Sequence, residues 1–368
     1  MDKPSKSAAE PHGEIITRRW TEQRWLLDNI IRSVGVDWDQ PRTISYNAPC
    51  GPEANADFAA IRERVKKYAD IAPAFAATAR RREAKAQAAE DAGEPVTARH
   101  NYFMAAIHWA AAQWPYDENN ETNLGCNERK RECYTRYAKL ADHRVEAAWI
   151  PFQGKVLPGW FHLPPGYQGG RIPAVVSIPG MDGFKEANIS MYGDRWLARG
   201  IIGSSFGSFF STIVCANEPR FRACAVSATC LEPGCHTIFE EASPTFKRRF
   251  MYMSGYTDED AFDEFCKTLT WEGHAGKIRV PYLCVAGEAD ELSPPEHTER
   301  LLRILACPKQ LVVYQDCRHS VGNVPSTNLG PAPAVLVADW MNARLSGKPF
   351  PSERWYVEAS GRVVKTPL

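Results

Sequence analysis

The pentapeptide Gly203-Ser204-Ser205-Phe206-Gly207 constrains the fold of this chain more than any other sequence feature. It reads G-x-S-x-G and stands between an Ile-Ile pair and the apolar run 208–215, which is typical of a sharp turn from a strand into a helix. The two glycines permit a strained backbone that lifts the hydroxyl of Ser205 clear of a sheet. The same letters occur in ordinary turns, so a nucleophilic Ser205 depends on the rest of the chain.

Residues 144–368 alternate strands with helices. Apolar runs predict strands at 172–178, 224–228, 282–286 and 310–314, with helices at 188–199, 209–216 and 335–345. This alternation predicts an α/β fold with a doubly wound, mostly parallel sheet. Residues 145–152 and 156–163 predict a hairpin before the sheet, and residues 355–358 and 362–365 predict a surface hairpin after it.

The residues before 144 have a different texture, and the segment from 57 to about 140 is rich in alanine and charge. Apolar residues recur at helical spacing between residues 57 and 140, and a further helix is expected near residues 20–34. The chain of 368 residues is long enough for two domains. We therefore expect an N-terminal helical region at 1–143 and an α/β catalytic domain at 144–368.

The charge balance argues against two classes of partner. Lysine plus arginine number 44, as do aspartate plus glutamate, so no overall field favours nucleic acid or an anionic membrane. A small, largely neutral molecule is the expected ligand. The polar start of the chain lacks the apolar stretch of a signal peptide, and no run approaches the roughly 18 apolar residues of a membrane span. We expect a cytoplasmic protein, and the sequence is compatible with a homodimer.

The cysteines do not have the spacing of a metal or disulfide framework. Their number, 11, is odd, and no C-x-x-C pair occurs; Cys230 and Cys235 come nearest to one. Most of the others lie in apolar runs, where cysteine behaves as a small buried hydrophobe. We expect reduced, structural thiols and no metal.

A serine nucleophile needs a base that takes its proton and an acid that orients the base. Asp290 follows the strand expected at 282–286, and His319 follows the one expected at 310–314. Loops at the carboxyl ends of parallel strands meet at one edge of the sheet, so both side chains are expected near Ser205. The order serine, acid, histidine is that of the α/β-hydrolase triad.

Both partners of the serine have alternatives. Glu288 or Glu291 could be the acid in place of Asp290, which could instead cap the helix that follows it. His297 and His274 are the other candidate bases, although both have the pattern of exposed helix positions.

An oxyanion formed at the serine needs backbone N–H donors. The residue after the nucleophile, Phe206, supplies one, and the second is expected from the loop 179–183 after the first strand of the sheet. Met181 is the first choice for this donor, with Asp182 next. No lysine of the P-loop type follows the glycines, so phosphate binding is not expected. Hydrolysis needs only water and these donors, so no cofactor is implied.

Several segments together resemble one family. They are residues 150–159 (IPFQGKVLPG), 179–186 (PGMDGFKE), the serine turn and residues 287–290 (GEAD), preceded by the helical region. Over most of its length the chain resembles the α/β-hydrolases related to 2,6-dihydropseudooxynicotine hydrolase and the fungal pigment hydrolases that shorten polyketide pyrones. The resemblance implies a helical region that packs over the active site as a cap. It also implies cleavage of a carbon–carbon bond beside a ketone, or of an ester in related branches.

Two chemical hypotheses follow from the resemblance. In the first, Ser205 attacks a ketone of a substrate like a 1,3-dicarbonyl, His319 relays the proton, and a stabilised carbanion leaves. In the second, the same residues hydrolyse an ester and an alkoxide leaves. The early steps are identical, so the sequence favours neither.

The chain departs from the family pattern before the serine turn. In that pattern the helix at 188–199 leads to another strand, an Asp-Gly-x-Gly loop and a second helix, whereas here Arg199 and Gly200 run directly into Ile201. A central strand and a helix are therefore missing. Strands commonly have about five or six residues, and only Ile201 and Ile202 precede the turn, so we expect a stub. A third hypothesis is accordingly a hydrolase-like scaffold that is inactive or impaired by the deletion.

Overall fold

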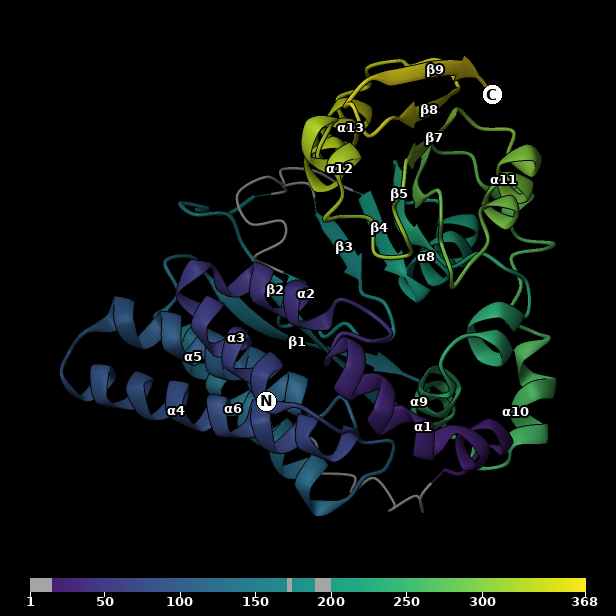
Figure 1. The fold of residues 1–368 in the computed structure, drawn as a ribbon. Coiled ribbons are helices and arrows are strands. Elements are labelled where there is room, and N and C mark those ends of the chain that lie inside the picture. Colours follow the sequence, from purple (N-terminus) through teal and green to yellow (C-terminus); the bar gives the residue numbers. More distant parts are fainter. Residues whose placement is uncertain (1–14, 171–173, 189–199) are drawn as a thin grey trace. The chain divides into compact units, whose positions relative to one another are not determined.

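The computed structural model describes residues 15–170, 174–188 and 200–368 (Figure 1). The chain forms two compact units, which are described separately. The first holds residues up to Ala141 together with Pro244–Asp263, and the second holds Asp142–Ser243 together with Glu264–Leu368. The described part of the chain contains no helix long and apolar enough to cross a membrane.

The first unit is helical, as residues 20–34 and 57–140 predict. Its helices are α1 (Arg18–Val34), α2 (Arg42–Asn47), α3 (Asn55–Arg64), α4 (Ile71–Asp91), α5 (Pro95–Ala112), α6 (Glu121–Leu140), α9 (Pro244–Ser254) and the start of α10 (Glu259–Cys266). Every residue of α5 from Asn101 to Ala112 is buried. A helix that is apolar on all sides belongs in a core, so α5 is the centre of this unit.

Buried charges attach α9 to the rest of the helical unit. The ammonium of Lys247 is almost fully buried and lies 2.9 Å from Glu259 and 2.6 Å from Asp263. The guanidinium of Arg248 lies 3.9 Å from the ring centre of Trp20 and 3.6 Å from a carboxylate oxygen of Asp117. A buried charge is tolerated only when it is paired in this way, so these contacts explain how a distant segment joins the helices.

The second unit contains a separate two-stranded hairpin, as expected from residues 145–163. Its strands, β1 (Val145–Phe152) and β2 (Lys155–His162), pair in an antiparallel manner along their whole length. Gln153 and Gly154 both have positive φ, 46° and 74°, as a two-residue turn with the twist of a hairpin requires.

The main sheet has seven strands, in the order β3-β4-β5-β6-β7-β8-β9. They are β3 (Val175–Ile178), β4 (Gly200–Ser205), β5 (Cys224–Thr229), β6 (Tyr282–Gly287), β7 (Lys309–Tyr314), β8 (Glu353–Val357) and β9 (Val363–Pro367). All neighbours are parallel except β8 and β9. The doubly wound, mostly parallel sheet expected from the sequence is therefore confirmed.

The expected surface hairpin near the C-terminus proved to be part of this sheet. β8 pairs with β7 in parallel, from Gln310↔Glu353 to Tyr314↔Val357, and Val357 is fully buried. The alternation of apolar and polar residues predicts the hairpin itself, but it does not show that β8 pairs with β7. The hairpin was therefore expected on the surface and not in the sheet.

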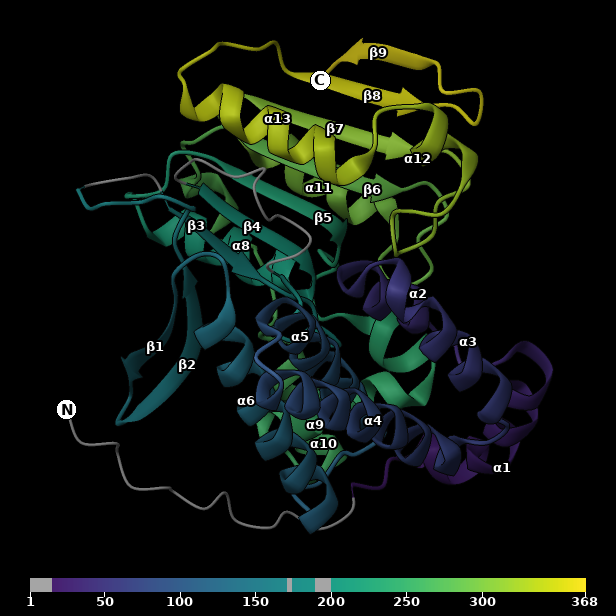
Figure 2. The ribbon, with the colours of Figure 1, turned by 90° about the vertical axis from the view of Figure 1, so that its left-hand side faces the viewer.

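Helices cover both faces of the sheet (Figure 2). One face packs against α8 (Phe206–Asn217) and α11 (Pro295–Ile304), and the other packs against α13 (Pro333–Leu345), with the short α12 (Pro325–Leu329) near its start. Neighbouring residues along a strand point to opposite faces, so Ile201 joins the first core and Ile202 the second. The short apolar sequence of β4 thus contributes to both cores.

The strand before the serine turn is longer than expected. β4 runs for six residues because Gly203 of the turn pairs with both β3 and β5, and Ser204 and Ser205 continue the pairing with β5. The expected stub is therefore wrong in length. The sequence analysis predicts that a central strand is missing, and in the described part of the sheet β3 is the last strand on its side. The helix expected at 188–199, except for its first residue, and residues 172–173 of the strand expected at 172–178 lie outside the described residues.

All eleven cysteines are free and buried, as expected for structural thiols. Burial raises the pKa of thiols such as Cys284, which keeps them protonated and unreactive. No group of three or more potential metal-ligating side chains occurs among the described residues.

Candidate active site

Ser205 lies at the carboxyl end of β4, on the sharp turn into α8. Its backbone has φ 54° and ψ −129°, a conformation that is strained for any residue with a side chain. β5 bulges opposite the turn, because Ser204 pairs with Ser227 and Ser205 pairs with Thr229. The structure therefore places Ser205 on the strained strand-to-helix turn that its G-x-S-x-G context predicts.

The two glycines of the motif are required by close packing. A Cβ on Gly203 would overlap the carbonyl oxygen of Gly207, and a Cβ on Gly207 would overlap that of Ile178 and lie 2.7 Å from that of Pro179. The start of α8 thus lies directly on the end of β3. Any larger residue at either position would push the turn away from the sheet.

The structure brings His319 and Asp290 to Ser205, from the loops after β7 and β6. Nε2 of His319 lies 2.8 Å from Oγ of Ser205, and Nδ1 lies 3.0 Å from each carboxylate oxygen of Asp290. The histidine and the aspartate are 3% and 7% exposed, so little water competes for these hydrogen bonds.

Asp290 is held by the backbone that follows it. Its Oδ1 accepts the backbone N–H groups of Leu292 and Ser293, each at 2.9 Å. These bonds orient the carboxylate toward the imidazole, which fixes Nδ1–H as the donor and leaves Nε2 to face the serine.

The surroundings of His319 favour its protonated form. Burial alone lowers the pKa of the imidazole, but the charge and hydrogen bonds of Asp290, together with Cys230 and Glu291, outweigh burial and raise the pKa to about 9. A carboxylate that stabilises the imidazolium is what a base needs when it takes a proton during a reaction.

The alternative candidates lie elsewhere. Glu288 accepts the hydroxyl of Tyr356 at 2.9 Å, and Glu291 accepts a backbone N–H instead of the imidazole. His274 contacts Asn217 at 3.2 Å, and His297 lies 3.7 Å from Glu232. Only Asp290 is hydrogen-bonded to the ring of His319 among the acids that the sequence nominates.

The loop expected to supply the second oxyanion donor lies against the serine. A Cβ on Gly180 would be 2.5 Å from Cβ of Ser205, so only glycine fits there. Met181 and Asp182 follow in a tight turn that the N–H of Gly183 closes onto the carbonyl of Gly180 at 3.0 Å. Phe206 begins α8 directly after the serine and is buried. Both nominated donors therefore belong to backbone that borders Ser205.

Backbone contacts also join the acid loop to the histidine loop. The N–H of Ala289 donates to the carbonyl of Cys317 at 2.8 Å, and the N–H of Asp316 donates to Oε2 of Glu288 at 3.3 Å. A Cβ on Gly287 would overlap the carbonyl of Cys317. The sequence suggests Glu288 and Glu291 only as alternative acids. It does not reveal that their carboxylates accept backbone N–H groups of the histidine loop.

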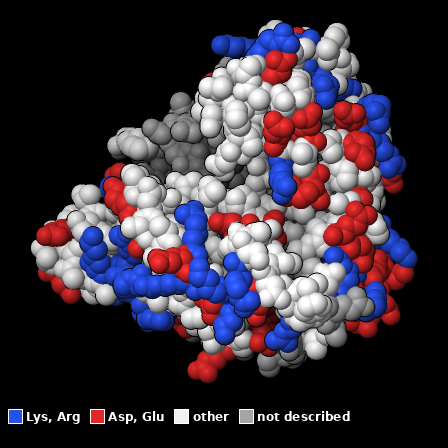
Figure 3. Space-filling model, viewed as in Figure 1, with Lys and Arg blue, Asp and Glu red and all other residues white. Residues whose placement is uncertain are grey.

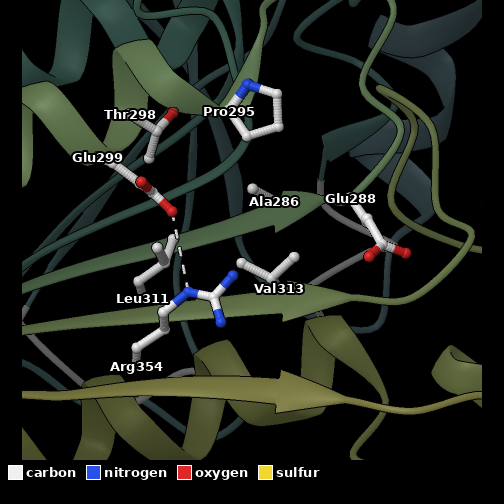
Figure 4. A pocket seen from close by; sticks show the side chains of 8 residues that line it. All are labelled: Ala286, Glu288, Pro295, Thr298, Glu299, Leu311, Val313 and Arg354. Atoms are coloured by element: carbon white, nitrogen blue, oxygen red, sulfur yellow. Dashed lines mark ion pairs between the residues drawn. The ribbon is translucent and has the colours of Figure 1, made fainter. Parts of the chain in front are cut away.

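A small cavity lies beside this region, between β6, β7, β8 and α11 (Figure 4). It has a volume of about 110 Å³ and is lined by Ala286, Glu288, Pro295, Thr298, Glu299, Leu311, Val313 and Arg354. Glu299 and Arg354 face each other across it at 3.8 Å. Sites for small organic molecules are usually about 300 Å³ or more, so this cavity fits water or a small ion better than a substrate.

The described strands and helices have the arrangement of the α/β-hydrolase fold, with Ser205 at the strand-to-helix turn after β4. Residues 192–327 match the family model described as "Serine hydrolase (FSH1)". The crystal structure of 2,6-dihydroxy-pseudo-oxynicotine hydrolase has the same fold, with a TM-score of 0.71, 21% identity, and coverage of 84% of this chain and 98% of that one. The structure of AbyA5 matches with a TM-score of 0.59 and 13% identity, over 83% and 93% of the two chains.

Two curated relatives to which the chain is similar are named alpha/beta hydrolases. Alpha/beta hydrolase ucsC from Acremonium sp. is 27% identical over 46% of this chain and 35% of its own length. Alpha/beta hydrolase xenA from Xenoacremonium sinensis is 32% identical over 29% of this chain and 26% of its own length. The matched part of the chain thus spans about a third or less of these relatives. The resemblance to this group of hydrolases is confirmed.

Proposed function

We propose that the chain is a serine hydrolase with Ser205 as nucleophile, His319 as general base and Asp290 as the acid that orients the imidazole. The observation that supports this most strongly is the unbroken run of hydrogen bonds from Oγ of Ser205 through the ring of His319 to Asp290. As Oγ attacks a carbonyl carbon, Nε2 takes its proton and Asp290 stabilises the imidazolium. The N–H groups of Phe206 and Met181 donate to the oxyanion.

The proposed substrate is a small neutral ketone with a second carbonyl two carbons away. When the oxyanion collapses, the carbon–carbon bond breaks and its electron pair leaves as an enolate, which takes the proton from His319. Water, deprotonated by the same imidazole, then hydrolyses the acyl group from Ser205. The name of the hydrolase with the similar fold and the implied chemistry of the family support this choice. A net charge of zero, with acidic and basic side chains both present on the face in Figure 3, agrees with a neutral ligand.

Ester hydrolysis is the second candidate, because the same residues perform it with an alkoxide as leaving group. Purified chain is therefore offered an aryl 1,3-diketone and a short ester of the same aryl acid. Cleavage of the diketone supports carbon–carbon hydrolysis. Rapid turnover of the ester with an intact diketone would overturn it in favour of a carboxylesterase.

The inactive or deletion-impaired scaffold is tested with a fluorophosphonate probe, which labels a serine only when base and oxyanion donors act on it. We expect the chain to be labelled, Ser205→Ala to lose the label, and Ser204→Ala, which removes the neighbouring hydroxyl, to keep it. Circular dichroism verifies that each variant is folded. A folded wild-type chain that takes no label would favour the inactive scaffold.

A further inference from the structure

Glu291 contacts His319 through its backbone and not through its ring. Its Oε2 accepts the backbone N–H of the histidine at 3.0 Å, whereas Nδ1 of the ring is bonded to Asp290. A hydrogen bond from an N–H to a carboxylate is charge-assisted and roughly twice as strong as a neutral one. Because this N–H is one bond from the Cα that carries the imidazole, the contact restrains the point from which the ring projects.

We propose that Glu291 is a positioning residue for the general base, whose carboxylate holds the loop of His319 so that Nε2 stays directed at Ser205. The proposal rests on the hydrolase function proposed above. The N–H of Asp316 in the same loop also donates to a carboxylate, that of Glu288, at the longer distance of 3.3 Å, and a backbone bond from Ala289 to Cys317 at 2.8 Å joins the two loops as well. Glu291 is thus the shorter carboxylate tie and the one at the histidine itself.

The electrostatic environment gives Glu291 a second effect on the same imidazole. Among the described residues, the ionisable groups that act most strongly on His319 are Asp290 and Glu291 from the loop after β6 and Cys230, which directly follows β5. The hydroxyl of Ser205 faces the other nitrogen of the ring. Each of the three raises the pKa of the histidine. Asp290 is buried, whereas Glu291 is exposed to solvent, so salt screens the contribution of Glu291 much more.

The test separates the hydrogen bond from the charge. Glu291→Gln keeps an acceptor oxygen and loses the charge; Glu291→Ala loses both. We expect kcat on the best substrate to fall less than about threefold in Glu291→Gln and about tenfold or more in Glu291→Ala, as for removal of an orienting group. Glu296→Gln removes a comparable exposed charge from the first turn of α11 and should leave kcat unchanged. Equal kcat in all four proteins would overturn the positioning role.

The effect of the Glu291 charge on His319 is measured through the pH at which the imidazole titrates. Removing a carboxylate destabilises the imidazolium, so both Glu291 variants should shift the acidic limb of kcat/KM to lower pH, by about half a unit for an exposed charge. Addition of 1 M NaCl to the wild type should move the limb in the same direction, and should have no further effect in Glu291→Gln. A merely structural role would leave the limb in place.

A titration that needs no turnover distinguishes this proposal from the function itself. The histidines are labelled with nitrogen-15, the signal of His319 is assigned with His319→Gln, and its pKa is measured by NMR. A lower pKa in Glu291→Gln than in Glu296→Gln and wild type supports the proposal even if no tested substrate is hydrolysed. An unchanged pKa in Glu291→Gln, with full kcat in Glu291→Ala, would overturn it even in an active enzyme.

Discussion

β4, the strand that carries Ser205, has different neighbours on its two sides. On one side lie β5, β6 and β7, each six residues long and almost entirely buried, and the loops after β6 and β7 carry Asp290 and His319. On the other side lies β3, four residues long and partly exposed, followed by the loop with the proposed donor Met181. The strand that the sequence analysis predicts to be missing would lie beyond β3, which is the last described strand on that side.

The two sides hold the serine turn by different interactions. The β5–β7 side uses charged and polar groups: the imidazole, Asp290, and the carboxylate and backbone bonds between two loops. The β3 side uses close backbone packing at Gly180 and Gly207, where no Cβ fits. This contrast explains how the turn keeps its geometry beside the four-residue edge strand β3. Close packing needs only the last residues of β3, whereas the polar side needs several buried strands to align its loops.

The largest expected effect comes from disabling the polar side. Asp290→Asn or His319→Ala should lower kcat/KM by about 10⁴-fold, because the base is then absent or held in the wrong tautomer. His297→Gln, which removes a histidine outside the hydrogen-bonded set, should change it less than threefold. The comparison is made by steady-state kinetics on the best substrate and by the rate of fluorophosphonate labelling. A loss of only tenfold in His319→Ala would remove this residue from the proposed machinery.

A smaller loss should follow from disturbing the β3 side. Gly207→Ala places a methyl group against the carbonyl oxygens of Ile178 and Pro179, so the turn must move off β3. We expect kcat to fall about a hundredfold, since small displacements of reacting groups have effects of this size. Overpacking should also lower the free energy of unfolding by about 1–3 kcal/mol. Both are measured beside wild type, by kinetics and by denaturant unfolding.

Gly276→Ala is the matched control for this substitution. Gly276 is also helical, but a Cβ there meets nothing within 4 Å, so alanine should be neutral or slightly stabilising through its higher helix propensity. If Gly207→Ala behaves like Gly276→Ala, the contrast between a polar side and a closely packed side is wrong.

The polar side is also the more predictable one from sequence. Continuous apolar runs mark β5, β6 and β7, and a parallel sheet brings the residues after them to one edge, which is sufficient to nominate Asp290 and His319. The turn at Ser205 is predicted by its two glycines together with the Ile-Ile pair before it and the apolar run after it. The strands and the turn could be predicted because strand period and turn chemistry are local properties of the chain, and the structure places Asp290 and His319 beside Ser205.

Other features depend on neighbours that are distant in sequence. Gly203 and Ser204 read as turn residues, yet pairing with β3 and β5 extends them into β4. Residues 353–357 alternate like any exposed hairpin strand, and only pairing with β7 makes them part of the sheet. From the sequence, Glu291 is only an alternative candidate for the acid. Its hydrogen bond to the backbone N–H of His319 could not be predicted, because the two residues are 28 positions apart along the chain.

The smallest expected effect is a difference in how the two sides respond to pH. The folded protein raises the pKa of His319 from 6.5 to about 9, so its imidazolium stabilises the fold. That contribution is fully present below about pH 6.5 and is lost as the pH rises through about 9. The stability lost in His319→Gln, measured by denaturant unfolding, should therefore be larger at pH 6 than at pH 9.5. The loss in Gly207→Ala involves no titrating group and should be the same at both. A pH-independent loss in His319→Gln would contradict a raised histidine pKa, and a pH-dependent loss in Gly207→Ala would show that the two sides of β4 are not held by separate interactions.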